Sequence, residues 1–348
     1  MKKIFAILLT VSMVLFLASC SSGGTPSTPS PNASNNNTPT PANNDKKIII
    51  KLGHALTETN FRHTAALKFK ELVEQKSNGT MEVQVFSGEQ LGSESAMLQS
   101  IVTNSIQATP VATGLFAKYS PSIGVIELPY LFENFEQAWK VLDGAVGKEL
   151  ADPLIGKGIR IISYWENGFR QITNSKKPIE KPEDLKGVKI RTPEIPVSLS
   201  VLKAMGANSL GMAYSELYPA LEQHVVDGQE NPLTNINASK FYEVQKYLSM
   251  TGHQYSPVPF AVSEAFWKTL SPDQQKIISD SGKEAGQMMR ELVKQDDIKL
   301  KAELQTKGML INEPDKKPFQ EAVAPVYKEY ESTYGKELIE KVRSAARQ

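Results

Sequence analysis

The order of strands and helices along residues 46–113 constrains the fold more than any other feature of this sequence. KKIIIKLGHA is an apolar run that ends in a turn at Gly53, FRHTAALKFKELVEQKS carries apolar residues at helical spacing, and TMEVQVF alternates as a strand does. SESAMLQSIVTNS again has helical spacing, and IQATPVAT is a short strand. This β-α-β-α-β order predicts an α/β fold in which helices cover a parallel sheet.

The α/β pattern recurs after residue 158. GIRIISYW and GVKIRTP read as strands, IPVSLSVLKAMGA and SELYPALEQHV as helices, and NSLGMAY as an extended segment. No sequence repeat relates the two α/β units. A length of 348 residues is also in the range of about two domains.

A long helix is predicted to begin at Ser271-Pro272-Asp273-Gln274. Serine caps a helix, proline suits its first position, and glutamine stands at the capping-box position. Helical spacing continues until Gly308, so about 35 residues predict a helix of about 50 Å that bridges two domains. The alternative is two helices with a bend near residues 295–297.

The N-terminus has the pattern of an exported lipoprotein. Two lysines precede an apolar run, Ile4 to Ala18, and Cys20 is the only cysteine in the chain. The pattern resembles a bacterial lipoprotein signal, so residues 1–19 are predicted to be a signal peptide and Cys20 a lipid anchor to the membrane. An uncleaved signal anchor is the alternative. Residues 20–45, rich in Ser, Thr, Pro, Asn and Gly, are predicted to be a disordered linker.

Charge and motif content give no support to several functions. The 39 basic residues nearly balance the 38 acidic ones, so nothing indicates a nucleic-acid partner. The phosphate-loop, G-x-G-x-x-G, H-E-x-x-H and G-x-S-x-G patterns are absent. The histidines do not have the spacing of metal ligands. We therefore expect no metal, no cofactor and no enzymatic activity.

Arg191 stands where a strand should end. Val188 and Ile190 alternate with Lys189 as in a half-buried strand, and Pro193 restrains the loop that follows. Ligands collect at the carboxyl ends of strands in open α/β sheets, and a guanidinium matches a carboxylate in two parallel bonds. The position predicts a carboxylate site, with a structural ion pair as the alternative.

Seven stretches, taken in order, resemble the extracytoplasmic solute-binding subunit of TRAP transporters, the DctP family that binds dicarboxylates and sugar acids. The resemblance covers nearly the whole chain after residue 46. The stretches are SGEQLGSESAM, ELPYLF, YWENGFRQITNSKKPI, IRTPE, GMAYSELYPALEQ, VVDGQENPL and KFYEVQKYL.

The resemblance implies a two-lobed, periplasmic-binding-protein-like fold of type II, with the long helix spanning both lobes. One lobe would comprise residues 46–168 plus 257–296, and the other residues 169–256 plus 297–348. An organic acid would be trapped between the lobes as they close and then delivered to the TRAP membrane permease, outside the cytoplasm.

The family's cleft residues fall on five positions of this sequence. Arg191 would clamp the ligand carboxylate, and Arg170 would assist it or neutralise a second anionic group. Asn231, Tyr214 and His54 would complete the cleft. The alternatives are a purely structural role for Arg170 and a turn-stabilising role for Asn231. For Tyr214 the alternative is core packing, and for His54 it is a satisfied interior histidine.

Two further positions bear on the ligand. Ala112 replaces a glutamate that sialic-acid-binding members carry, which argues against sialate. At least one of Trp165, Glu166 and Asn167 is expected to line the cleft, and we place Trp165 among the ligand-binding residues. With His54 and Asn231 as hydroxyl partners, a hexuronate is favoured slightly over a C4-dicarboxylate.

Two other hypotheses stay open at this point. One is an ABC-type or sensor-associated binding lipoprotein for a neutral or amino-acid ligand, which would bind regardless of Arg191. The other is a secreted lipoprotein enzyme, for which the sequence offers no acid–base pair or metal set.

Overall fold

The computed structural model describes residues 47–347, which belong to one compact unit. The predicted signal peptide, the predicted lipid anchor at Cys20 and the predicted linker lie outside these residues. Within the described part of the chain, no helix combines the length and the apolar character that crossing a membrane requires.

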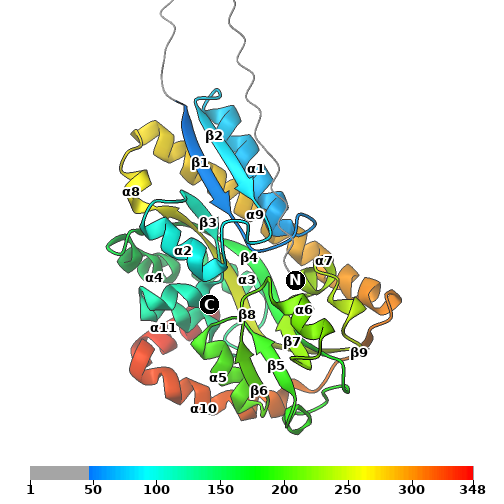
Figure 1. Ribbon diagram of the computed structural model, residues 1–348. Coiled ribbons are helices and arrows are strands. Elements are labelled where there is room, and N and C mark those ends of the chain that lie inside the picture. The colour runs from blue at the N-terminus through cyan, green and yellow to red at the C-terminus, as the bar shows by residue number, and fades with distance from the viewer. Residues whose placement is uncertain (1–46, 348) are drawn as a thin grey trace, which may run out of the picture. The chain divides into compact units, whose positions relative to one another are not determined.

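One sheet forms the centre of the molecule (Figure 1). Within residues 47–347 its strands follow the order β2-β1-β3-β8-β4-β7-β5-β6, and β9 pairs with β8. The strands are β1 Ile48–Gly53, β2 Met81–Phe86, β3 Ala108–Pro110, β4 Ile159–Asn174, β5 Lys189–Thr192, β6 Asn208–Gly211, β7 Gly228–Asn231, β8 Tyr247–Ser263 and β9 Leu310–Asn312.

The strands of both predicted α/β units pair in parallel. β1 lies between β2 and β3, and β5 lies between β6 and β7, all in parallel register. The predicted parallel arrangement is therefore confirmed within each unit. The sheet as a whole is mixed, because β4 and β8 run antiparallel to each other and to β7 and β3, respectively.

β4 and β8 are long enough to belong to both parts of the sheet. The start of β4 pairs with the end of β8 beside β3, and the end of β4 pairs with the start of β8 beside β7. We call the part with β1–β3 the first half and the part with β5–β7 and β9 the second half. The predicted lobe boundaries fall where Gly168 faces Ser256. Those boundaries stay a prediction.

The ladder between β4 and β8 is irregular at this crossing. The register shifts between Trp165 and Gly168. Gly168 has φ +123°, and a Cβ there would lie 3.0 Å from a carbon of Pro232. Only glycine meets both conditions without strain, so the chain passes from one half to the other at a position that excludes a side chain.

Helices cover both faces of the sheet. They are α1 Phe61–Lys76, α2 Glu94–Val102, α3 Phe135–Asp143, α4 Ala145–Ile155, α5 Pro196–Ala204, α6 Leu217–Glu222, α7 Leu233–Ala238, α8 Glu264–Trp267, α9 Pro272–Thr306, α10 Lys316–Tyr334 and α11 Lys336–Arg347. Short 3-10 segments occupy Thr113–Lys118, Pro121–Glu127, Pro182–Leu185 and Phe241–Glu243.

α9 confirms the predicted long helix. It has 35 residues and starts with the predicted capping box between Ser271 and Gln274. The helix continues through residues 295–297, so the two-helix alternative is wrong. It packs against α1, β4 and α7, and thus contacts both halves of the sheet.

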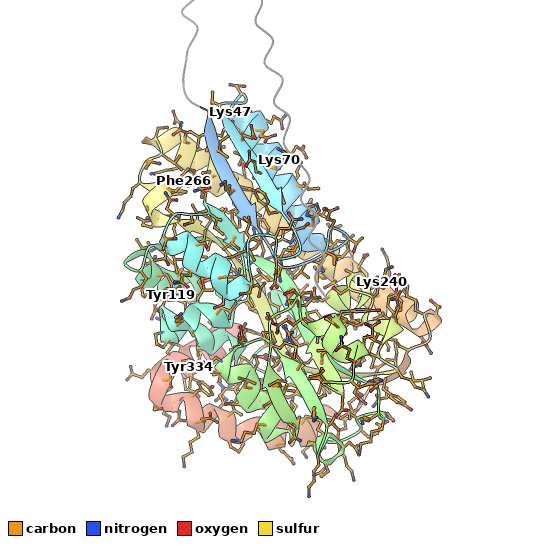
Figure 2. All side chains as sticks on the ribbon, viewed as in Figure 1. Lys47, Lys70, Tyr119, Lys240, Phe266 and Tyr334 are labelled. Carbon is orange, nitrogen blue, oxygen red and sulfur yellow. The ribbon has the colours of Figure 1, made fainter. Side chains whose placement is uncertain are left out.

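The apolar core of residues 47–347 consists of three clusters. The largest includes residues from α2, α3, α5 and α10, among them Tyr334. A second, between α1, the first half of the sheet and α9, includes Phe69 and Phe266. The third lies under α6 and α7. Figure 2 labels Phe266 and Tyr334, which mark two of these clusters in the upper and the lower part of the view.

Candidate functional site

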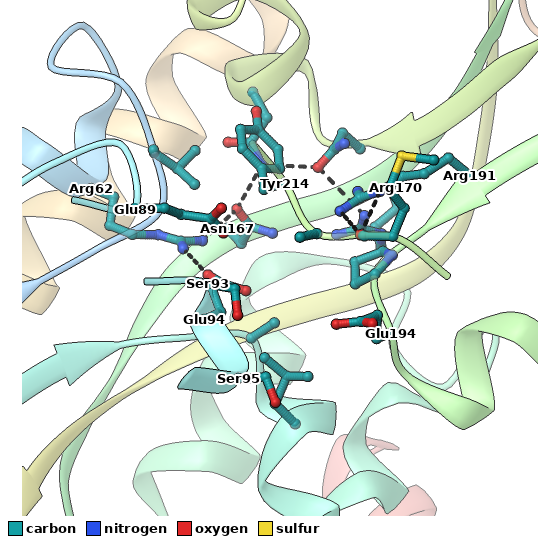
Figure 3. A pocket seen from close by; sticks show the side chains of 18 residues that line it. Arg62, Glu89, Ser93, Glu94, Ser95, Asn167, Arg170, Arg191, Glu194 and Tyr214 are labelled. Carbon is teal, nitrogen blue, oxygen red and sulfur yellow. Dashed lines mark hydrogen bonds and ion pairs between the residues drawn. The ribbon is translucent and has the colours of Figure 1, made fainter. Parts of the chain in front are cut away.

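A narrow pocket of about 40 Å³ lies between the two halves (Figure 3). The first half contributes Leu56, Arg62, Glu89, Ser93, Glu94, Ser95, Ala112 and Leu115. The crossing segment and the second half contribute Asn167, Arg170, Arg191, Pro193, Glu194, Met212, Ala213, Tyr214, Asn231 and Asn235. Most of these residues lie at strand ends or in the loops that follow, where ligands collect in open α/β sheets.

The two halves contact each other around the pocket. The Asn60 amide donates to Asn235 Oδ1 at 3.0 Å. The backbone N–H of Ser215 donates to Glu89 Oε2 at 3.2 Å, and Thr59 Oγ1 donates to a backbone carbonyl of α7 at 3.3 Å. These contacts join the two halves around the pocket.

Arg191 is buried without a carboxylate partner among residues 47–347. It lies at the end of β5 and is 2% exposed. Its Nε and Nη2 donate to the Met212 carbonyl at 3.1 and 2.6 Å, whereas Nη1 has no partner. Burial lowers the pKa of Arg191 to about 10, so the side chain is still charged at neutral pH. The structure therefore shows a buried cation that is not in the alternative structural ion pair.

Arg170, in contrast, is paired. It lies on β4 and makes a two-pronged contact with Glu230 on β7, with Nη2 2.9 Å from Oε1. Burial opposes ionisation of Glu230, but Arg170 and His253 outweigh it and lower its pKa to about 2. Thr192 Oγ1 also donates to this carboxylate, at 2.6 Å. Arg170 thus lines the pocket, but Glu230 already compensates its charge, as in the structural alternative.

An amide network joins the rest of the site. Asn231 Oδ1 accepts from the Asn235 amide at 3.0 Å, and the Asn231 amide donates to Gln229 Oε1 at 2.5 Å. Asn235 also donates to Asn167 Oδ1, at 3.1 Å. Of the three consecutive candidates at residues 165–167, Asn167 is the one that lines the pocket. Tyr214 lines it too, with its ring centroid 5.7 Å from the Arg191 guanidinium.

Trp165 and His54, two of the predicted site residues, are not among the residues that line this pocket. Trp165 stacks on Phe260 with ring centroids 4.5 Å apart, and its Nε1 donates to the Gly282 carbonyl of α9 at 2.8 Å. His54 is fully buried, with Nε2 3.0 Å from His63 Nδ1. Burial, together with the charge of Arg62, lowers the pKa of His54 to about 3. Both side chains are packed in the interior of the protein, and their contact with a ligand stays a prediction.

The sequence analysis missed Arg62, Glu89 and Glu94. Arg62 is 2% exposed and donates to Glu94 Oε1 at 2.6 Å and to Asn167 Oδ1 at 3.2 Å. One signal was available: Arg62 shares the core-facing stripe of α1 with Ala66, Phe69 and Val73. A permanent cation in such a stripe needs a buried partner.

Glu127 is a buried carboxyl group close to the site. It is 1% exposed, and its Oε2 has no hydrogen-bond partner. Burial raises the pKa of Glu127 from an ordinary value of 4.5 to about 7, against the lowering effect of Arg170. The folded state therefore binds more protons than the unfolded state between these values, and stability decreases as the pH rises through this window.

We expect Glu127→Gln to stabilise the protein at pH 8 by about 2–3 kcal/mol, because the amide needs no deprotonation inside the fold. The gain should shrink at pH 5, where the wild-type carboxyl group is protonated. Urea denaturation of wild type and variant at pH 5 and pH 8 measures the difference in the free energy of unfolding. Glu321→Gln, which changes an exposed residue of α10, is the control. A variant that is less stable than wild type at pH 8 would contradict the expectation.

The fold and the pocket define a solute-binding protein, with two halves that enclose a buried cation. The family model "DctP: Bacterial extracellular solute-binding protein, family 7" matches residues 52–333, and the chain belongs to this family. Its members are the solute-binding proteins of TRAP transporters. The predicted family is thereby confirmed, and the comparisons do not support the ABC-type alternative.

Three similar proteins illustrate the relationship. The 2,3-diketo-L-gulonate-binding periplasmic protein YiaO of Escherichia coli K12 is 36% identical over 275 residues, which cover 79% of this chain and 84% of that protein. The sugar acid binding protein DctPAm of Advenella mimigardefordensis, in complex with galactonate, has a TM-score of 0.84 and 38% identity, covering 87% and 98% of the two chains. A TRAP periplasmic solute binding protein of Sulfurospirillum deleyianum with bound succinate has a TM-score of 0.82 and 32% identity, covering 86% and 99%.

Proposed function

We propose that this protein captures a small organic acid outside the cytoplasm and delivers it to a TRAP membrane permease. The ligand would be a sugar acid or a C4-dicarboxylate, the classes that the similar structures hold. One observation carries this proposal: Arg191 is a buried cation that lines the pocket and has no carboxylate partner among the described residues.

The free part of the Arg191 guanidinium determines how it holds an acid. The Met212 carbonyl occupies Nε and one hydrogen of Nη2. Both hydrogens of Nη1 and the second hydrogen of Nη2 remain available, and they suit the two oxygens of a carboxylate. The Tyr214 ring beside the guanidinium and the amides of Asn231 and Asn235 would then position the rest of the ligand.

Ligand binding would favour the closed form. Contacts from both halves are available only when the halves meet, so a ligand shifts the equilibrium toward that state. We propose that the ligand leaves unchanged, since the family to which the chain belongs is one of solute-binding proteins. The permease would then recognise the closed surface.

We also propose that the protein is anchored to the membrane by a lipid on Cys20. The sequence of residues 1–20 supports this proposal. A tether of residues 20–45 would keep the folded unit near the permease.

Melting temperatures with and without ligand test the proposed function. The chain from Ser21 onward would be measured with sugar acids, C4-dicarboxylates, neutral sugars and amino acids. Galacturonate and galactose form a matched pair that differs only in the carboxylate. An acid at about 100 times its Kd stabilises the native state by about 2.7 kcal/mol, which raises the melting temperature measurably. Stabilisation by galactose, or by none of the acids, would contradict the proposal.

A further inference from the structure

The charged residues of the pocket are distributed unequally between its two sides. Figure 3 shows Arg62, Glu89 and Glu94 on one side and Arg170 and Arg191 on the other. These two groups come from opposite halves of the sheet, so a bound molecule that spans the pocket would contact both.

Arg191 leaves one side of the pocket with a positive charge. Glu230 compensates Arg170, but no carboxylate in residues 47–347 pairs with Arg191. Glu194 also lines this side, but it is solvent-exposed. Water screens such an exposed carboxylate, so it offsets little of the buried charge.

Glu89 leaves the opposite side with a negative charge. Glu94 already compensates Arg62 through its 2.6 Å ion pair. Glu89 Oε2 accepts only from the backbone N–H of Ser215, and Glu89 Oε1 is buried without a hydrogen-bond partner. No cation is within ion-pair distance of Glu89 in the described residues. An ionised carboxylate accepts hydrogen bonds but cannot donate them, so Oε1 is available to accept from a donor group of the ligand.

We propose that the pocket selects acids with one carboxylate and a hydroxylated chain over acids with a carboxylate at each end. This inference rests on the proposed function and defines its ligand class. The single carboxylate binds Arg191, and a hydroxyl group at the far end of the ligand donates to Glu89 Oε1. The ligand thus meets one uncompensated charge of opposite sign and one acceptor that needs a donor.

A dicarboxylate fails at Glu89 for two reasons. Its second carboxylate would lie beside a like charge inside a closed pocket, where water screens the repulsion poorly. The second carboxylate also has no hydrogen to donate, so Oε1 stays unsatisfied. Sites that hydrogen-bond to a substrate hydroxyl discriminate strongly against analogues without it, because the buried polar group is left unpaired.

Galactonate and galactarate provide a matched test, because they have the same length and differ only at C6, which is a hydroxymethyl group in one and a carboxylate in the other. Gluconate and glucarate repeat the comparison with another stereochemistry. Calorimetric titration of the wild-type chain gives the Kd of each acid. In the pair whose aldonate binds more tightly, the Kd of the aldonate should be at least 100-fold lower than that of the dicarboxylate. Glu89→Gln keeps the shape and an acceptor but removes the charge, and should narrow this ratio at least tenfold. Glu321→Gln should leave it unchanged.

The outcomes separate this inference from the proposed function. If wild type binds the dicarboxylate of either pair as tightly as the aldonate, the selection is overturned, although the acid-binding function stands. The selection is also overturned if succinate binds while neither aldonate does. It is overturned as well if Glu89→Gln leaves the ratio of the dicarboxylate Kd to the aldonate Kd unchanged. If no acid of any kind binds, the proposed function itself fails.

Discussion

Replacing Arg191 by methionine is expected to abolish ligand binding and leave the free protein folded. A buried charge that loses its partner contact typically costs about 2–5 kcal/mol of binding free energy, or roughly 30- to 5000-fold in Kd. Methionine retains much of the side-chain volume, and the free protein no longer has to bury an unpaired cation. The melting temperature of the ligand-free variant should therefore differ little from that of the ligand-free wild type.

Calorimetric titration with the ligand found for wild type measures the loss, and circular dichroism verifies the fold. Lys189→Met is the matched control, because Lys189 is the exposed first residue of the same strand. It removes the same charge outside the pocket and should bind normally. Two results would contradict the proposal that Arg191 binds the ligand carboxylate. One is normal binding by Arg191→Met, and the other is loss of the folded state of this variant without ligand.

Glu230→Gln is expected to destabilise the folded protein strongly. Glu230 is fully buried and holds Arg170 through a two-pronged ion pair, so the amide leaves a buried cation without a counter-charge. Breaking such a pair costs about 3–5 kcal/mol. Urea denaturation at pH 7 measures the difference, and Glu303→Gln, which breaks an exposed pair with Lys307, should leave the midpoint nearly unchanged.

The effect of Glu230→Gln should depend on pH. The pKa of Glu230 is lowered from 4.5 to about 2, so its contribution to stability is fully present above 4.5 and is lost as the pH falls toward 2. The difference between wild type and variant should shrink over that window. A midpoint that matches wild type at pH 7 would show that Arg170 does not need Glu230.

Local sequence patterns predicted the elements of the fold well. The β-α-β-α-β order, the capping box at Ser271 and the long helix that follows depend on neighbouring residues, and all are present. Arg191 was identifiable because ligands collect at strand ends in open α/β sheets and a guanidinium there suits a carboxylate.

The parts of the site that the sequence did not predict depend on contacts between residues that are far apart in the chain. The partner of Arg170 is 60 residues away, and nothing in either segment indicates the pairing. The sequence could not decide which of residues 165–167 faces the pocket, because the ladder between β4 and β8 shifts register directly after Trp165 and regular alternation of side chains is lost there. His54 follows a predicted strand, but its ring turns toward His63 in α1.

α9 links the cores of the two halves of the molecule. Ile278 to Val293 pack in the core of the first half, whereas Leu300 and Leu304 pack in the core of the second half. Both ends of the helix are thus fixed, and any rotation of one half against the other has to bend the backbone between residues 294 and 299. Bending lengthens helical hydrogen bonds, so opening of the proposed kind would store elastic energy in this short segment and closing would release it.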